Sequence, residues 1–386
     1  MKGEHEKVTT NNRSKKYLFV TTLIISMTIV ASGCGNPGNA TASSAKASVA
    51  PSSEAVANEE KPIFDEGVDT KVTVTYEKYK GKDQKMFLSA GDKVAVISPS
   101  AIPSKEQVEA TVSGLKKWGY VPVEGKHVYQ DVRTLDEIRE DLEWALSDKE
   151  TKAIFCVRGG YGSTEIMDTL SKDLIAKSGK MIIGYSDISV YHSAWTSAGV
   201  PSIHACMSGT FDGLDPKCAE AEEKILKGEV PVYTCEVKAK GQDGKGEGIL
   251  IGGNLSTYTG VLGTAYEASK TDKPYILFLE DIGEDVQHIH RYLAVLKHLG
   301  VLDKASGIIF GEWTEVPLDM DDYDGTNRGG EFKSVADMIT RQYLGDLKCP
   351  VAFGFPAGHG DVNYPLLMGE EAVLEVTEKT YKLSWD

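Results

Sequence analysis

The clearest candidate for a catalytic nucleophile is a serine at the end of an apolar run. The run closes at Ile183 and leads through Gly-Tyr-Ser-Asp into a helical pattern at 188–198, with Ser186 at the turn. A glycine permits the tight bend that exposes the hydroxyl, and an amide at the start of the helix can stabilise an oxyanion. The pattern predicts a nucleophile elbow in which Ser186 attacks and the amide of Asp187 binds the oxyanion. The alternative is that Ser186 or Asp187 only caps the helix.

A glycine-rich turn follows an earlier apolar run, with the sequence Arg-Gly-Gly-Tyr-Gly-Ser from Arg158 to Ser163. Glycines allow backbone amides to approach a bound molecule closely, so Gly159 or Gly160 can supply a further oxyanion contact. The turn has neither the Lys-Ser/Thr ending of a Walker loop nor the glycine spacing of a dinucleotide fingerprint. By itself it fits any loop that binds an anion.

A serine nucleophile needs a base whose pKa is near neutrality, and histidine meets that requirement. His359 lies in a glycine-flanked turn after an apolar run, which would hold it at the end of a strand. A solvent-facing turn histidine, and His204 as the base instead, are the competing interpretations. Glu280 and Asp281 follow another apolar run. Either carboxylate can orient the histidine, and ordinary solvation or helix capping is the alternative for both.

The elements that would position these residues alternate between short apolar strands and amphipathic helices. Such alternation is typical of a parallel sheet whose ligands bind beyond the carboxyl ends of the strands. The first set comprises strands at 93–97, 153–157 and 180–183 and helices at 105–118 and 135–146. The second set comprises strands at 248–251, 275–279, 307–310 and 351–355 and a helix at 286–299. We therefore predict an α/β protein with an N-terminal domain at 90–235 and a C-terminal domain at 245–386.

The N-terminus predicts export. Basic residues precede an apolar stretch from Tyr17 to Ala31, as in a secretory signal, and the stretch is short for a membrane span. It closes on Ala-Ser-Gly-Cys, which resembles a bacterial lipobox and predicts an extracytoplasmic, membrane-anchored lipoprotein with its lipid on Cys34. We expect a signal peptide at 1–33, a flexible tether at 34–61 and a spacer or added strand at 62–89. An uncleaved anchor and a plain signal peptide are the alternatives.

Composition argues against several other functions. The 386-residue chain has a formal net charge of −15, which disfavours nucleic acid as a partner and disfavours membrane attachment through a basic patch. The cysteines other than Cys34 are widely spaced and form no metal-binding motif. We therefore expect no disulfide framework, no metal and no organic cofactor. The sequence leaves open whether the protein forms a homodimer.

Several short motifs occur in an order that resembles the LD-carboxypeptidase family of serine peptidases, over nearly all of residues 90–386. They are Gly91-Asp92, Ser98-Pro99-Ser100, RGGYGS at 158–163, IGYSDIS at 183–189, Gly252-Gly253-Asn254, LEDIGE at 279–284 and GFPAGHG at 354–360. The resemblance implies a doubly wound N-terminal domain and a β-rich α/β C-terminal domain, with the active site at their junction. It also implies a triad of Ser186 as nucleophile, Glu280 as orienting carboxylate and His359 as general base and acid.

The same resemblance implies the substrate and the chemistry. The expected reaction cleaves, through an acyl-enzyme, the bond between an L-configured centre of a diamino acid and a terminal D-Ala in muropeptide tetrapeptides. Arg158 or Asn254 is expected to bind the substrate's carboxylate. Two alternatives stay open. One is a peptidase resembling the microcin-C immunity proteins, which act on peptidyl-nucleotide conjugates, and the other is a lipoprotein that binds wall peptides without cutting them.

Overall fold

The computed structural model describes residues 70–81, 84–212, 215–316 and 332–385. The predicted signal peptide, Cys34, the tether and the first part of the predicted spacer lie outside these ranges. Within them, no helix has the length and apolar content that a membrane crossing requires. All the described elements belong to one compact unit of the chain, Glu59–Asp386.

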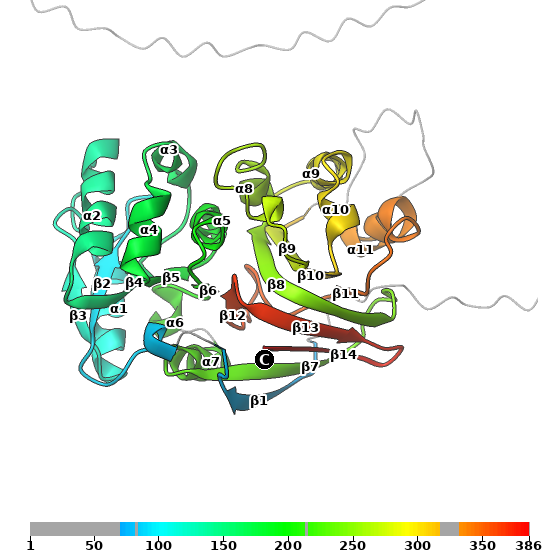
Figure 1. Cartoon of the computed structure of the whole chain (residues 1–386), viewed down its shortest axis with the longest axis horizontal. Helices are drawn as coiled ribbons and strands as arrows, with labels where there is room; N and C mark the ends of the chain where they lie inside the picture. Colours follow the sequence, from blue (N-terminus) through cyan, green and yellow to red (C-terminus); the bar gives the residue numbers. More distant parts are fainter. Residues whose placement is uncertain (1–69, 82–83, 213–214, 317–331, 386) are drawn as a thin grey trace, which may run out of the picture. The chain divides into compact units, whose positions relative to one another are not determined.

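A six-stranded sheet organises one half of this unit (Figure 1). Its order is β12-β6-β5-β4-β2-β3, and strands β2 to β6 run parallel. The chain passes from β2 to β3 on one side and then returns to β4 on the other, so the sheet is doubly wound, as predicted. Its strands are β2 (Lys93–Ile97), β3 (Val121–Glu124), β4 (Thr151–Cys156), β5 (Met181–Gly184), β6 (Ser202–His204) and β12 (Leu366–Met368).

Helices cover both faces of this sheet, with α2 to α5 above it and α1, α6 and α7 below it in Figure 1. Reciprocal capping boxes, which satisfy the free amides of a first helical turn, begin two of them: Ser104 with Gln107 before α1, and Thr134 with Glu137 before α2. The helices are α1 (Lys105–Lys117), α2 (Leu135–Ser147), α3 (Ser163–Met167), α4 (Lys172–Ser178), α5 (Ser189–Ser197), α6 (Gly209–Asp212) and α7 (Pro216–Leu226).

An eight-stranded mixed sheet organises the other half, in the order β1-β7-β14-β13-β8-β9-β10-β11. Strands β8 to β11 are parallel to one another, whereas β1, β7, β14 and β13 pair antiparallel. This arrangement confirms the predicted β-rich α/β half. Its strands are β1 (Val72–Lys78), β7 (Glu229–Glu236), β8 (Gly244–Asn254), β9 (Tyr275–Ile282), β10 (Gly307–Thr314), β11 (Val351–Phe353), β13 (Glu371–Val376) and β14 (Thr380–Trp385).

The helices of this half lie beside the parallel strands β8 to β11 in Figure 1. Their apolar residues, among them Ile289 and Leu293 of α9, form a buried cluster with side chains of β9 and β10. These helices are α8 (Leu255–Thr259), α9 (Val286–His298), α10 (Val301–Lys304) and α11 (Val335–Ile339), which continues into a π-helical turn (Thr340–Leu344). The short 3-10 turns of the unit are η1 (Gln84–Met86), η2 (Ser186–Ile188) and η3 (Ala268–Lys270).

The two sheets exchange strands instead of following the order of the chain. Strand β7 falls almost wholly within the predicted N-terminal range 90–235, yet it pairs with β1 and β14 in the eight-stranded sheet. The predicted spacer supplies β1, an edge strand of that sheet. In the opposite direction, β12 comes from the predicted C-terminal range and pairs antiparallel with β6, with Leu366 opposite His204. A boundary between 235 and 245 therefore does not separate the two sheets.

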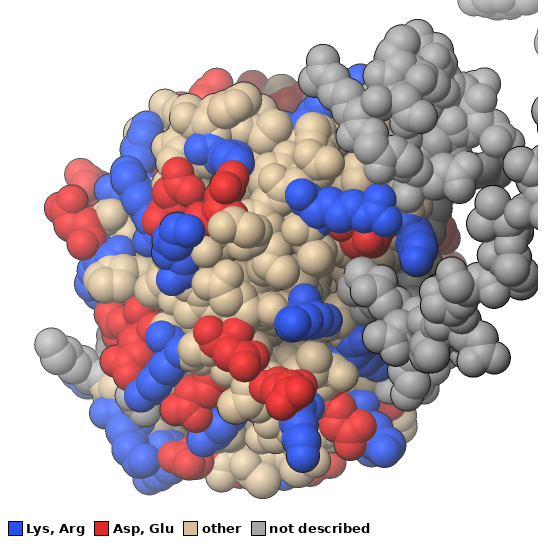
Figure 2. Space-filling view, turned by 90° about the vertical axis from the view of Figure 1, so that its right-hand side faces the viewer, with Lys and Arg blue, Asp and Glu red and all other residues tan. Residues whose placement is uncertain are grey.

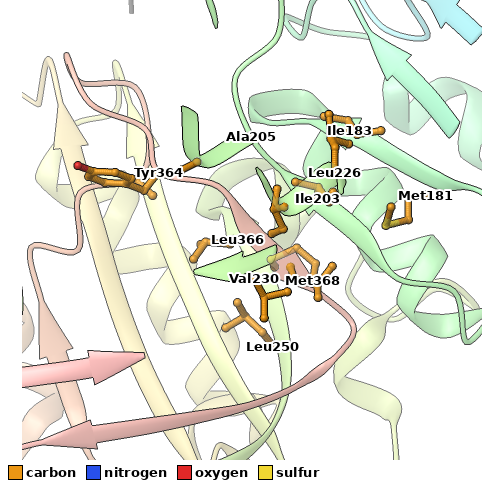
Figure 3. Packing of buried hydrophobic residues seen from close by; sticks show 14 of the residues in the cluster. Met181, Ile183, Ile203, Ala205, Leu226, Val230, Leu250, Tyr364, Leu366 and Met368 are labelled. Atoms are coloured by element: carbon orange, nitrogen blue, oxygen red, sulfur yellow. The ribbon is translucent and has the colours of Figure 1, made fainter. Parts of the chain in front are cut away.

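One buried apolar cluster is shared by both sheets, as Figure 3 shows. Ile183 and Ile203, from β5 and β6, belong to the same cluster as Val230 and Leu250, from β7 and β8. Met368 of β12 lies among them. Because burial of apolar side chains is the main driving force for folding, this shared core ties the two sheets into one unit.

The charged residues are spread over the surface in Figure 2, which shows the right-hand side of Figure 1. Lysine and arginine side chains alternate with acidic ones around an uncharged area. On this face, the net charge of −15 is not gathered into one acidic patch.

Candidate active site

Ser186 lies at the bend that follows β5, in a conformation that is rare for serine. Its φ is +64°, and Glu315 is the only other non-glycine residue with positive φ in the described ranges. The left-handed conformation costs about 1–2 kcal/mol for a residue with a Cβ, so the surrounding structure must hold it. The chain continues through η2 into α5, and no side chain caps that helix. The capping alternative for Ser186 and Asp187 is therefore wrong, and the strained bend favours a nucleophile elbow.

The side chain of Asp187 fastens this bend to two neighbouring loops. It is buried, and its Oδ2 accepts hydrogen bonds from the amide of Ser163 at 2.9 Å and from the hydroxyl of Ser100. These bonds join the ends of β2 and β4 to the end of β5. The carboxylate of Asp187 is therefore structural, and its backbone amide is the group to consider as an oxyanion donor.

Gly159 packs directly against the candidate nucleophile. A Cβ at this position would lie 2.9 Å from the Cβ of Ser186 and 3.2 Å from its Oγ, so a side chain does not fit there. The carbonyl of Gly159 accepts a hydrogen bond from the amide of Ala101 at 3.2 Å, which fixes the turn. The glycine turn that contains Gly159 and Gly160 thus meets the serine bend, because β4 and β5 are neighbouring parallel strands.

The side chains of Glu280 and His359 are hydrogen bonded to each other. Nδ1 of His359 lies 2.7 Å from Oε2 of Glu280, whose side chain is completely buried on β9. Asp281 points elsewhere, since it accepts hydrogen bonds from the amides of Ser256 and Ile282. Of the two carboxylates that the sequence left open, Glu280 is the one that contacts the histidine.

The electrostatics of this pair favour a charged histidine. Burial would lower the pKa of His359, but the hydrogen bond that its Nδ1 donates to Glu280 and the charges of Glu280, Asp281 and Glu312 raise it above its ordinary value. Burial also raises the pKa of Glu280, and the bond to His359 opposes that effect. A carboxylate that stabilises an imidazolium is the arrangement that a serine-activating base requires.

The side chain of His359 reaches the serine bend from the other sheet. Its ring centroid lies 4.8 Å from that of Tyr185, the residue that precedes Ser186. His204, the alternative base, is fully buried on β6 and packs edge-on against Tyr185 and Phe278. Burial holds the pKa of His204 well below its usual value. The geometry therefore favours His359 over His204 as the base.

The two residues expected to bind a substrate carboxylate differ in exposure. Arg158 is exposed beside the glycine turn, and its Nη1 donates to the carbonyl of Ile102 at 2.9 Å. Asn254 is buried, and its Nδ2 donates to Oδ1 of Asp281 at 2.8 Å. Its Oδ1 accepts from the amide of Thr257 and so caps α8. Asn254 therefore holds other protein groups in place, and Arg158 is the better candidate for substrate contact.

A further acidic side chain beside this pair was not predicted from the sequence. Glu312 lies near the end of β10, and its Oε2 accepts a hydrogen bond from the amide of Gly360, which follows His359. Burial raises the pKa of Glu312 to about 7. The only sequence signal is its position shortly after the apolar run 307–310, which parallels the position of Glu280 after 275–279.

The described ranges contain no group of three histidine, cysteine or acidic residues that could hold a metal ion. The five cysteines in these ranges are buried, and none of them forms a disulfide. A cavity of about 560 Å³ lies away from the site, at the amino ends of β4 and β5. Its lysine-rich lining includes Lys180, whose ammonium donates to two carbonyls at the end of α2, Ala145 and Asp148. That contact explains Lys180 as a helix-capping cation.

Comparison with known protein families identifies two matching domain models. The LD-carboxypeptidase N-terminal domain matches residues 94–205, and the LD-carboxypeptidase C-terminal domain matches residues 247–374. The first match contains Ser186 and the glycine turn, and the second contains Glu280 and His359.

Individual relatives agree with these matches. The probable murein peptide carboxypeptidase of Bacillus subtilis is 31% identical over 305 residues, which cover 76% of this chain and 92% of that protein. The murein tetrapeptide carboxypeptidase of Pseudomonas aeruginosa is 31% identical over 308 residues, covering 73% and 93% of the two chains.

Solved structures show the same fold. The muramoyltetrapeptide carboxypeptidase from Oxalobacter formigenes is similar with a TM-score of 0.66 and 26% identity, over 75% of this chain and 97% of that one. An MccF-like protein from Bacillus anthracis has a TM-score of 0.64 and 23% identity, over 78% and 99% of the two chains. At that identity, the second comparison speaks for the fold alone.

Proposed function

Because this chain belongs to the LD-carboxypeptidase family, we propose that it removes the terminal D-Ala from muropeptide tetrapeptides by cleaving the L,D bond. The names of the murein carboxypeptidases that it resembles support a wall-peptide substrate. One observation carries the proposed serine mechanism. His359 is hydrogen bonded to the buried Glu280 and packs against Tyr185, next to the strained Ser186.

The proposed mechanism uses these groups in two half-reactions. His359 takes the proton of the Ser186 hydroxyl as the oxygen attacks the scissile carbonyl, and Glu280 stabilises the imidazolium that forms. The amides of Asp187 and of Gly159 or Gly160 bind the oxyanion. Collapse of the intermediate transfers the proton from His359 to the departing amine of D-Ala and leaves an acyl-enzyme. Water, deprotonated by His359, then hydrolyses the ester and restores Ser186.

Defined muropeptides test the bond that is cut. Incubation of the protein with a tetrapeptide ending in D-Ala should release that residue and leave a tripeptide, as measured by mass spectrometry. A tetrapeptide ending in L-Ala should stay intact, because inversion at the terminal Cα exchanges the directions of its methyl group and carboxylate and so misaligns the scissile bond with Ser186. Cleavage of a pentapeptide between its two D-Ala residues would instead indicate a D,D-specific enzyme.

The resemblance to microcin C7 self-immunity protein MccF supports a second candidate, a peptidase for peptidyl-nucleotide conjugates. MccF in complex with glutamyl sulfamoyl guanosine has a TM-score of 0.65 and 22% identity to this chain. A conjugate of this kind should be incubated in parallel with the tetrapeptide. Preferential cleavage of the conjugate would favour the second candidate. Binding of the tetrapeptide without cleavage by a folded protein would favour a non-catalytic wall-peptide receptor.

We also propose that the protein is anchored through a lipid on Cys34, because basic residues, an apolar stretch and Ala-Ser-Gly-Cys occur in the order of a lipoprotein signal. Replacement Cys34→Ala should release the protein from the membrane fraction or block removal of residues 1–33. Fractionation with immunoblotting measures both effects. Unchanged processing and unchanged membrane association would contradict the lipid anchor.

A further inference from the structure

Glu312 is bonded to the loop of His359 on both sides of the histidine. Its backbone amide donates to the carbonyl of Ala357 at 3.1 Å, and its Oε2 accepts from the amide of Gly360 at 2.9 Å. The first bond continues the backbone pairing near the end of β10, while the second depends on the side chain. A single residue therefore fixes the loop before and after His359.

The same loop is confined between two acidic side chains. A Cβ at Gly358 would lie 2.9 Å from Oε2 of Glu280 and 3.3 Å from the Cβ of Glu312. A Cβ at Gly360 would lie 2.1 Å from Oε2 of Glu312. Side chains do not fit at either glycine, so the backbone around His359 lies directly against Glu280 and Glu312. This packing holds the imidazole in one place.

Glu312 can change its charge in the pH range where the histidine works. Burial raises the pKa of Glu312 to about 7, with a smaller opposing effect from the Gly360 hydrogen bond. The other groups that act on it are Glu280 and Asp361, which raise its pKa, and Lys238, which lowers it. The charge of Glu312 in turn raises the pKa of three other groups, namely His359, Cys218 and Tyr381. In its ionised form, Glu312 raises the pKa of His359.

We propose that Glu312 is a positioning residue for His359: its hydrogen bond to Gly360 holds the histidine loop, and its charge stabilises the imidazolium. The inference rests on the proposed function, in which His359 is the base. Glu312 exchanges no proton with the substrate. It acts through His359, and its two contributions, the hydrogen bond and the charge, are separable by substitution.

Replacement Glu312→Gln keeps an oxygen that can accept from Gly360 but removes the charge. The acid limb of kcat/KM, which reports the loss of neutral His359, should move to lower pH by roughly one unit. Because Glu312 itself titrates within the range of the measurement, with a pKa that burial raises to about 7, the limb of the unmodified protein should be broad, and that of the variant should fit a single ionisation. At high pH, kcat should stay close to that of the unmodified protein. The measurement is the rate of D-Ala release from the tetrapeptide at pH values from about 5 to about 9, which cover about two units on either side of neutrality.

Replacement Glu312→Ala removes both the charge and the hydrogen bond. It should move the acid limb in the same direction and also lower kcat at every pH, on the order of 10²-fold, because the imidazole is no longer held. Asp361→Asn is the matched control. It removes a charge from the same loop, but Asp361 is exposed, so solvent should screen its effect and the acid limb should hardly move. Thermal melting identifies any variant that fails to fold.

Each result bears on one part of the proposal. An acid limb that stays in place or moves to higher pH in Glu312→Gln would overturn the charge effect. An unchanged high-pH kcat in Glu312→Ala would overturn the positioning effect. If Glu312→Ala does not fold, Glu312→Leu takes its place, because leucine also lacks the charge and the hydrogen-bonding oxygen. A high-pH kcat of Glu312→Leu equal to that of Glu312→Gln would then overturn the positioning effect. Failure of the serine mechanism is recognised separately, by activity that survives in Ser186→Ala.

Discussion

Replacement of Ser186 by alanine should lower tetrapeptide cleavage on the order of 10⁴-fold or more, because the attacking oxygen is lost while binding is retained. The substitution removes one partly buried hydroxyl and no apolar group, so the melting temperature should change little. Ser197→Ala, at the end of helix α5, which follows the turn of Ser186, is a matched control that should keep normal activity. Substantial cleavage by a folded Ser186→Ala protein would exclude the serine mechanism.

The histidine should share this effect instead of adding to it. His359→Ala alone should cause a loss of similar size, and the double replacement should be little worse than either single one, because nucleophile and base contribute to the same step. Kinetics of the two single variants and the double variant measure the coupling. Losses that multiply would mean that Ser186 and His359 act independently.

The second large effect is expected for Glu280→Gln. Loss of the buried charge removes the group that stabilises the imidazolium, so kcat should fall about 10³-fold, less than for Ser186→Ala. The pKa of His359 should also fall, since Glu280 is the main cause that raises it, and the acid limb of the pH profile should therefore move to lower pH.

A buried acid elsewhere provides the comparison. Glu267 is buried and accepts hydrogen bonds from the amide of Gly263 and the hydroxyl of Ser269, and it is not among the groups that shift the pKa of His359. Glu267→Gln should leave both kcat and the pH profile near those of the unmodified protein. A Glu280→Gln protein with the same profile as this control would show that Glu280 does not act on the base.

Local sequence patterns predicted a helix or strand well where the apolar periodicity and the end residues lie within one short segment. The predicted helix 105–118 is α1, Lys105–Lys117, and its start is marked by the Ser104 and Gln107 capping box. The predicted strand 275–279 lies within β9, and the predicted helix 286–299 is α9, Val286–His298. In each case the apolar period and the end signals lie within about a dozen residues.

Pairings between distant segments had no such signal. Nothing in the short run that forms β12 shows that it joins the sheet of β6, and nothing in β7 shows that it leaves the sheet that precedes it in the chain. The identity of a partner strand depends on long-range packing, which one sequence does not encode locally.

The site shows the same division. The bend at Ser186 and the glycine turn were recognisable because a short motif determines each conformation. Glu312 was missed because its importance depends on Gly358 and Gly360, nearly fifty residues later in the chain. Arg158 or Asn254 was expected to bind the substrate's carboxylate, and the burial of Asn254 and its bond to Asp281 favour Arg158. Contacts of this kind appear only when the chain is folded.

The short strand β12 has a consequence for recombination between relatives. After the loop of His359, the chain enters β12 and completes the edge of the sheet that carries Ser186. A chimaera that joins the first half of one relative to the second half of another would therefore pair β6 of one parent with β12 of the other, in the sheet that carries Ser186. Crossovers that take Leu366–Met368 and β6 from the same parent should preserve the pairing of these two strands. The segments that must come from one parent are therefore those of one sheet, and they do not form a contiguous half of the gene.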